Sequence, residues 1–325
     1  MTLKVISQVK EKYMSLKNKK LVAILGGRPY MDNITLRRFL IPPVREKLKQ
    51  DGIDFIVATN NKSAAIDYKK IKGIKVIETS DSLHNEFMSR QREIKANLGA
   101  ETRETINQYA IQNNYDYALH LDDNIIQIFY HNVKNLCIKK NRPQAFCEIM
   151  NLLFYVAENS NSGAVGIEMS AYPSQDNIKI TAGFPYSFFV HRVDKDFKFE
   201  NSTEDDILMS IYNGINKKPS CIIRNALFYG KTGKKTSMDG NRKIYNAMLK
   251  ENKRGEYAES MYPNIYTRKV SYMVKSSTIQ KEPFLQHKHK LKKPKEWDNY
   301  LQIDNKVYDE IKKVLNKIHI RETNV

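Results

Sequence analysis

Short apolar runs alternate with segments of helical periodicity over the first 121 residues of the chain. Runs of strand length lie at residues 20–25, 54–59, 75–79 and 115–121, and apolar residues recur at helical spacing in 35–50, 82–98 and 99–114. The pair Pro42-Pro43 would bend the first of these helices or start a second one, and a loop rich in Asn and Lys is expected between the second and third strands. This alternation predicts an α/β fold with a mostly parallel sheet flanked by helices.

The fourth apolar run leads directly into Asp122, Asp123 and Asn124. Ligands of α/β sheets bind beyond the carboxyl ends of the strands, so this run would carry negative charge to a ligand site. Two adjacent carboxylates raise each other's pKa unless a cation lies between them, and hard oxygen ligands suit Mg²⁺ or Mn²⁺. The stretch predicts a metal–diphosphate site for a nucleotide-sugar, or else only a turn, since Asp and Asn are common in turns.

A Gly-rich turn follows the first strand. Gly26 and Gly27 would allow tight turning and a close approach of the backbone to a ligand, and Arg28 could reach a nucleotide phosphate. The motif is not GxGxxG, so it does not by itself predict a dinucleotide-binding fold.

A second acidic group, Glu204, Asp205 and Asp206, precedes the apolar side of a helix. Acids in a first turn suit the helix dipole, and Ser202 or Thr203 could cap the helix, so capping would also explain the group. The remaining elements are expected as helices at 1–20, 145–157, 244–250 and 305–318, strands at 164–171, 178–182, 221–229 and 266–274, and a cationic loop at 286–297.

The net charge of +18 is concentrated toward the C-terminus. Residues 217–325 hold 25 Lys and Arg against 11 Asp and Glu, a net charge of +14. A polyanionic partner would explain this excess, as would a merely well-solvated basic surface. No apolar run is long enough to span a bilayer, and the N-terminal stretch lacks the apolar region of a signal peptide. With three scattered cysteines that are expected to be reduced, a cytoplasmic protein without a membrane partner is predicted.

The order of these motifs resembles that of glycosyltransferases of the GT-A type. More narrowly, GGRPYMDNITLRRFL, LHLDDNI, NIKITAGFPYSFFVHR and TEDDILMSIYNGI are similar to the TET-associated glycosyltransferases, relatives of the enzyme that glucosylates hydroxymethyluracil to make base J, many of them phage-encoded. The resemblance covers roughly residues 20–240. It implies a GT-A (Rossmann-like) nucleotide-sugar-binding and catalytic core at 1–235. The C-terminal tail matches no part of that family; from its charge we expect a basic extension at 236–325 that packs on the core and contacts DNA. If the gene belongs to a phage, the protein would lie in the bacterial host cytoplasm.

The resemblance also implies roles for individual residues. A divalent metal, Mn²⁺ or Mg²⁺, would be held by Asp123 with Asn124 and by a late histidine, His287 or His289, although HKHK also fits a surface that faces phosphates. The turn is Asp-Asp-Asn rather than Asp-x-Asp, so its third position would bind metal through an amide oxygen or not at all. The nucleotide-sugar would contact Gly26, Gly27, Arg28, Arg103 and Asp122.

The acceptor side of the implied site comes from two later stretches. In an inverting reaction Asp205 would be the general base, with Asp206 in reserve and Glu204 as a structural or acceptor-binding partner; a retaining reaction would need no base there. The acceptor itself would contact Phe184, Tyr186 and His191, whereas His120, inside the fourth strand, is expected to be a core residue.

Together these features predict a metal-dependent enzyme that transfers a sugar, from a UDP-sugar, to a hydroxymethylated pyrimidine in double-stranded DNA. Chemistry on a base within a duplex requires the base to be flipped out of the stack. Two alternatives stay open: a GT-A enzyme that glycosylates a cell-surface glycan or a lipid-linked acceptor, and a DNA-binding protein without catalytic activity. The oligomeric state does not follow from the sequence.

Overall fold

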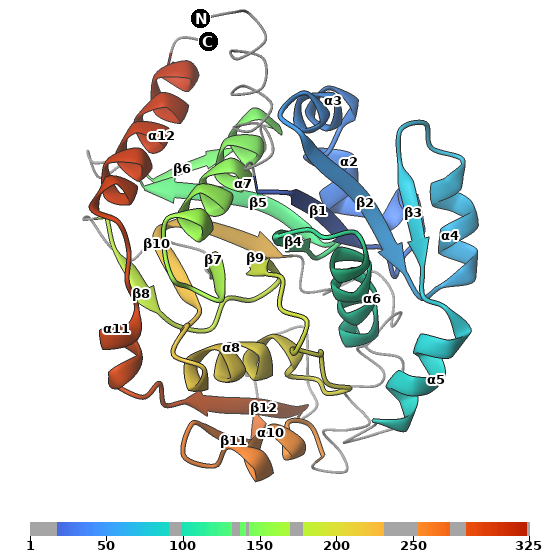
Figure 1. Cartoon of the computed structure of the whole chain (residues 1–325), viewed down its shortest axis with the longest axis vertical. Coiled ribbons are helices and arrows are strands. Elements are labelled where there is room, and N and C mark those ends of the chain that lie inside the picture. The colour runs from blue at the N-terminus through green and yellow to red at the C-terminus, as the bar shows by residue number, and fades with distance from the viewer. Residues whose placement is uncertain are drawn as a thin grey trace, which may run out of the picture.

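The computed structural model describes residues 18–90, 99–131, 137–140, 143–169, 178–230, 253–273 and 284–323. Ten of the described strands form one mixed sheet, and helices cover both of its faces (Figure 1). The strands of this sheet are β1 Lys20–Leu25, β2 Ile53–Thr59, β3 Lys75–Glu78, β4 Tyr117–Leu121, β5 Ile125–His131, β6 Cys137–Lys140, β7 Ala164–Met169, β8 Ile180–Ala182, β9 Phe188–Arg192 and β10 Cys221–Gly230.

The sheet order is β3-β2-β1-β4-β9-β7-β10-β5-β6, with β8 paired to β10. Strands β1 to β4 are mutually parallel, and so are β7 and β10. Strand β9 is antiparallel to both β4 and β7, so the carboxyl ends of β4 and β7 lie at the same edge of the sheet. The chain runs outward from β1 to β3 and then returns to the other side of β1 for β4, which creates a topological switch point at which α/β proteins bind ligands.

The helices are α2 Ile34–Arg38, α3 Pro42–Gln50, α4 Lys62–Lys69, α5 Asp81–Ser89, α6 Gly99–Gln112, α7 Pro143–Glu158, α8 Asp205–Ile215, α10 Glu256–Met261, α11 Glu296–Tyr300 and α12 Asn305–Thr323, with a short 3₁₀ turn, η1, at Tyr30–Asp32. Alternate residues of the central strands point to opposite faces. Val22 and Ile24 of β1 pack in one cluster with residues of α3, α7 and α12, whereas Leu21 and Ala23 pack with α6.

The predicted α/β class is confirmed, and most predicted elements are present with small shifts of their ends. The residues around Pro42-Pro43 form two helices, because α2 ends at Arg38 and Pro42 lies in the first turn of α3. Two expectations were wrong. The expected loop after β2 contains α4, whose N-terminus is capped by Asn61 through the amides of Ser63 and Ala64.

The second wrong expectation is the cationic loop, because residues 284–291 form strand β12 (Phe284–Leu291). This strand pairs with β11 (Tyr266–Met273) in a separate two-stranded sheet, so strand pairing accounts for the backbone hydrogen bonds that a loop would have left to water. The strand β5 directly after the acidic turn was not predicted. The helices expected at 1–20 and 244–250 lie outside the described residues, apart from the last three residues of the first, of which residue 20 begins β1.

The described part of the C-terminal region packs against the rest of the protein in two places. Val307 and Ile311 of α12 belong to the main hydrophobic cluster, and Figure 1 shows α12 alongside α7. Tyr266 and Trp297 form a second cluster with α8 and with Phe184. Trp297 packs so closely on Gly214 of α8 that a Cβ atom there would lie 2.2 Å from its ring. No helix among the described residues is long and apolar enough to cross a membrane.

Candidate active site

The acidic turn after β4 is held by a threonine that is distant in sequence. Thr35 is fully buried, its hydroxyl donates to the carbonyl oxygen of Asp122 (2.5 Å), and it accepts from the amide of Ile125 (2.9 Å). The Thr35 amide also donates to the carbonyl of Asp123 (3.2 Å). These bonds satisfy backbone groups that the sharp turn would otherwise leave unpaired, so the two carboxylates are presented from a rigid turn.

Arg103 joins Asp122 and Asp205, two acids that are 83 residues apart in the sequence. The guanidinium, whose side chain is 5% exposed, donates from Nη2 to Oδ1 of Asp122 (2.9 Å) and lies with Nε 2.8 Å from Oδ2 of Asp205. The alternation of side chains along β4 explains why Asp122 lies on the face of the sheet that α6 covers. Ala118 packs with α6, so His120 and then Asp122 follow on the same face, where α6 carries Arg103.

Asp123 lies on the other side of the turn and pairs with Arg28. The Arg28 guanidinium donates to Oδ1 of Asp123 at 2.7 Å. Burial raises the pKa of Asp123 to about 7; the Arg28 charge opposes this rise, and the neighbouring carboxylates of Asp122 and Asp32 add to it. A carboxyl that is half-protonated near neutral pH despite one guanidinium is a group whose ionised form a further cation would stabilise.

The carboxyls at the start of α8 are also shifted. Burial raises the pKa of Asp205, against the effect of Arg103, and burial together with the charge of Asp205 raises the pKa of Asp206 well above its ordinary value. Glu204, rather than Ser202 or Thr203, is the N-cap residue of α8, and Ser202 Oγ accepts from the Glu204 amide outside the helix, which corrects the predicted caps. Arg254, from the C-terminal region, lies with Nε 3.5 Å from Oε1 of Glu204.

The two glycines after β1 have different surroundings. A Cβ atom on Gly26 would lie 2.5 Å from Cγ1 of Val57 and 2.9 Å from Cε2 of Tyr68, so this glycine is required by packing inside the protein. This corrects the prediction that its backbone approaches a ligand. Gly27 is exposed, with no described atom within 4 Å of such a Cβ, and it stays a candidate for donor contact next to Arg28.

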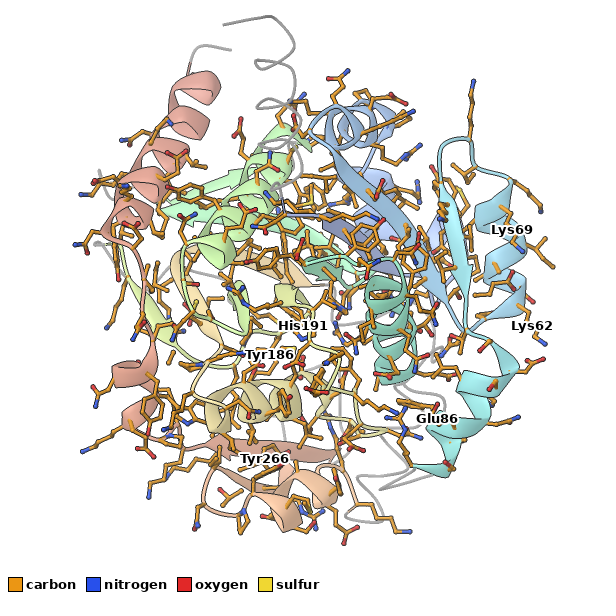
Figure 2. The ribbon with its side chains drawn as sticks, viewed as in Figure 1. Lys62, Lys69, Glu86, Tyr186, His191 and Tyr266 are labelled. Carbon is orange, nitrogen blue, oxygen red and sulfur yellow. The ribbon has the colours of Figure 1, made fainter. Side chains whose placement is uncertain are left out.

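A cavity of about 130 Å³ lies at the same edge of the sheet as the acidic turn. It is lined by Phe184 and Tyr186 of the loop before β9, by Glu168 at the end of β7 and by Arg224 of β10. The loop reaches the acidic turn, because the Asp122 amide donates to the carbonyl of Ser187 at 2.9 Å. Figure 2 shows Tyr186 in the middle of the molecule, between the sheet and α8.

Two backbone features keep this loop in place. Ser187 has a φ of 53°, a left-handed conformation that is rare for residues other than glycine and is often found at functional sites. Gly166 of β7 gives the loop room, because a Cβ atom there would lie 2.5 Å from Cβ of Pro185 and 2.9 Å from the carbonyl oxygen of Phe188. The structure thus brings Phe184 and Tyr186 close to the acidic groups.

His191 is buried, with 1% of its surface exposed, and packs against the rings of Phe197 and Phe199. Burial lowers its pKa to about 4. This position corrects its assignment as an acceptor contact, because strand alternation directs His191 into the layer between the sheet and α8. His120 is fully buried and stacks on Phe189, as predicted for a core residue.

The described residues contain no group of three or more His, Cys, Asp or Glu arranged to hold a metal ion. Mg²⁺ needs fewer protein ligands than that when substrate phosphates supply the others. The raised pKa of Asp123 fits such a partial site, and Asn124 lies half-buried in the same turn. The backbone of β12 pairs His287 with Val270 and His289 with Arg268, but the histidine side chains are outside the described residues, so their role as ligands stays a prediction.

Several polar residues of this edge were not predicted from the sequence. Glu101, fully buried in the first turn of α6, accepts from Asn60 Nδ2 (3.2 Å) and lies 2.7 Å from Nδ1 of His84. These groups follow β2 and β3, on the side of the switch point away from the cavity. Glu168 and Arg224 form the cavity's ion pair at 2.6 Å. Glu168 could have been singled out from the sequence, because it is a charged residue within the apolar run 164–169. The neighbouring sequence gives no indication that it pairs with Arg224.

Solved structures that resemble this chain include several distant likenesses. S. aureus TarS 1-349 in complex with UDP aligns with a TM-score of 0.40 and 11% identity over 71% of this chain and 65% of the TarS chain, and its complex with UDP-GlcNAc aligns with a TM-score of 0.37 and 11% identity over 72% and 66%. Mannose-1-phosphate geranyltransferase from Thermus thermophilus aligns with a TM-score of 0.28 and 12% identity over 66% of this chain and 58% of that one.

This chain therefore spans less than two thirds of the TarS chains that it matches. The sequence matches no protein-family model, and no curated protein is similar to it at a significant level. The predicted fold class, an α/β fold with a mostly parallel sheet flanked by helices, is confirmed by the strand order and directions. Likenesses this distant say nothing about the substrates of this chain.

Proposed function

We propose that the protein is a glycosyltransferase that takes a sugar from a nucleotide-sugar, with UDP as the nucleotide. The observation that carries this proposal is the position of Arg103 between Asp122 and Asp205, which unites the acidic turn and the acidic helix start in one site. That site lies at the switch point of the mixed sheet, and the loop that lines the cavity bonds to its acidic turn; α/β enzymes bind ligands at such a place.

The donor would lie over the acidic turn. Gly27, which is exposed, and Arg28 would contact one side of its diphosphate, and Asp123 would lie on the other side. The half-exposed guanidinium of Arg28 could leave Asp123 for a phosphate oxygen, since both are anionic oxygens within its reach. A divalent metal bound at Asp123 would stabilise the charge that develops on the departing diphosphate.

In the inverting form of the reaction, the acceptor hydroxyl oxygen attacks the anomeric carbon of the sugar. The bond from this carbon to the diphosphate oxygen breaks, its electron pair stays on the diphosphate, and the hydroxyl proton passes to a carboxylate. We assign this base to Asp206 rather than to Asp205. Asp205 is paired with Arg103 at 2.8 Å, which opposes the rise of its pKa, whereas burial and the charge of Asp205 raise the pKa of Asp206 well above its ordinary value and make it the stronger base.

For the acceptor we propose a hydroxymethylated pyrimidine in double-stranded DNA. The charge of +14 over residues 217–325 supports this acceptor, because phosphate contacts dominate the affinity of proteins for DNA. Lys290, Lys292 and Lys295 are exposed on the described part of this region, and we propose that residues 236–325 contact the DNA while residues 1–235 carry the catalytic core.

The test is a transfer assay with a panel of UDP-sugars, Mn²⁺ and three acceptors: duplex DNA with hydroxymethylpyrimidines, unmodified DNA and a cell-surface glycan. Mass spectrometry of the nucleosides should show a hexose or pentose added only to the hydroxymethylated base. Asp206→Asn should abolish this product while DNA affinity persists, and Asp196→Asn, the same change at an exposed position, should not. If sugar is transferred to the glycan alone, the proposed DNA acceptor is wrong. If the protein binds DNA but transfers no sugar from any donor, the proposed glycosyltransferase activity is wrong.

A further inference from the structure

The cavity beside the acidic groups combines aromatic walls with one ion pair. Phe184 and Tyr186 line it together with the aliphatic side chains of Ile167 and Ile222, and Glu168 and Arg224 supply its charges. Flat apolar walls with a small set of fixed polar groups are typical of pockets that select a ring and read its edge. In enzymes that act on a flipped base, the base stacks on such side chains and is read through hydrogen bonds.

A bulge in β10 places Arg224 at the cavity. Ile223 pairs with Ile167 of β7, but the next paired residue of β10 is Leu227, which pairs with Glu168. Residues 224–226 are therefore extra on β10, and such bulges redirect side chains next to active sites. The Arg224 guanidinium donates to Thr181 Oγ1 from Nε (3.2 Å) and to Glu168 Oε1 from Nη1 (2.6 Å), so its plane is fixed.

The two carboxylate oxygens of Glu168 differ in their surroundings. Oε1 accepts from Arg224, whereas Oε2 is buried without a hydrogen-bond partner among the described residues. A buried acceptor without a donor is unfavourable, and a bound N–H group would satisfy it. The pair then offers a ligand an acceptor, Glu168 Oε2, beside a fixed donor group, the Arg224 guanidinium.

The cavity lies beside α8, whose first turn carries the proposed base. Tyr186 lines the cavity and also packs against the cluster that contains Ile207 and Leu208, the residues that follow Asp206. A ring seated on Tyr186 and Phe184 would therefore lie beside the start of α8, within reach of Asp206 for a short substituent. A hydroxymethyl group is such a substituent.

We propose that this cavity binds the pyrimidine ring of the acceptor, with Glu168 Oε2 accepting a ring or exocyclic N–H and Arg224 donating to the adjacent acceptor atom of the same edge. The proposal rests on the proposed function and names the residues that select its acceptor. A pyrimidine offers an N–H next to an oxygen or nitrogen acceptor on its Watson–Crick edge. Glu168 and Arg224 are specificity-determining residues here and take no proton in the reaction.

Glu168→Gln is the decisive variant because it keeps the shape of the side chain. Its single amide oxygen can accept from Arg224 or from the base, but the two acceptor oxygens of the carboxylate are no longer both present. If the amide oxygen faces Arg224, its NH₂ group meets the N–H of the base, and two donors oppose each other. The acceptor KM, measured with a duplex oligonucleotide that carries one 5-hydroxymethyluracil, should rise about tenfold or more, as for a lost hydrogen bond to a charged group. Donor binding and UDP release without acceptor should stay unchanged. Arg224→Lys, which keeps the charge but loses the planar fork, should raise the same KM.

Glu46→Gln, at an exposed position of α3, is the matched control and should behave as the wild type. Free 5-hydroxymethyl-2′-deoxyuridine should compete with the oligonucleotide, and its N3-methylated form, which lacks the N–H, should not. An acceptor KM of Glu168→Gln equal to that of the control, or equal competition by both nucleosides, would overturn the proposal.

Failure of the proposed function gives a different pattern. A wild-type protein that neither binds a UDP-sugar nor transfers sugar would end the enzymatic assignment without deciding what the cavity holds. Saturation-transfer NMR with the two free nucleosides then tests the cavity directly. Binding of the unmethylated nucleoside that Glu168→Gln abolishes supports the proposal, and no binding to the wild type overturns it.

Discussion

Replacing Arg103 by methionine tests whether the two acidic groups depend on the guanidinium between them. Methionine keeps most of the aliphatic volume and removes the charge, which leaves Asp122 and Asp205 without the partner that lies 2.9 and 2.8 Å away. Removing one partner of a buried ion pair typically costs about 3–5 kcal/mol. Asp205, with 13% of its side chain exposed, should carry most of this loss, since Asp122, at 24%, is better solvated.

Protonation sets an upper limit to the loss at each carboxyl. To keep a carboxyl with the ordinary pKa of 3.8 neutral at pH 7 costs about 4 kcal/mol, at 1.36 kcal/mol per pH unit, and at pH 5 it costs only about 1.6 kcal/mol. Arg103→Met should therefore lower the free energy of unfolding by about 3–5 kcal/mol at pH 7 and by clearly less at pH 5. The sign follows because the folded variant takes up a proton that the unfolded chain does not hold at pH 7.

Urea unfolding is the assay, followed by the fluorescence of Trp297, which is the only tryptophan and is 3% exposed. A second substitution, Asp205→Asn, removes the stranded charge, so the double variant should be more stable than the sum of the two single losses predicts by about 1–2 kcal/mol. A loss below about 1 kcal/mol for Arg103→Met, the same loss at both pH values, or strict additivity would refute the reasoning.

Two further predictions concern packing and pH. Gly214→Ala places a Cβ atom 2.2 Å from the Trp297 ring, so it should destabilise the protein by about 1–3 kcal/mol in urea unfolding, despite the better helix propensity of alanine. Gly27→Ala, with no described atom within 4 Å, is its control, and equal stability of the two variants would contradict the packing. His191 has a folded pKa of about 4, so stability that is present above about pH 6.5 should be lost as the pH falls to about 4, by up to about 3 kcal/mol. His191→Phe removes this loss, and parallel stability–pH curves for wild type and variant would show that His191 does not titrate with folding.

The sequence alone was sufficient for the fold class and for the location of the acidic groups along the chain. Short apolar runs and apolar residues at a spacing of 3.6 are local sequence patterns that predict strands and helices. The end of such an element can be predicted where the apolar residues give way to polar ones. The acids at 122–123 and 204–206 lie at a strand end and a helix start, as predicted. The errors at 60–74 and 284–291 arose where charged and polar composition concealed a capped helix and a paired strand.

The tertiary structure decided which of these residues meet and what state they are in. Arg103 lies between two carboxylates, a pairing that the sequence did not predict, and His191 is buried among aromatic rings. Glu168 and Arg224, 56 residues apart, form a pair that no local pattern indicates. The physical reason is that strand and helix propensities act over a few neighbouring residues. Contacts, burial and pKa shifts depend on which strands and helices lie next to each other in space, and that arrangement exists only in the folded chain.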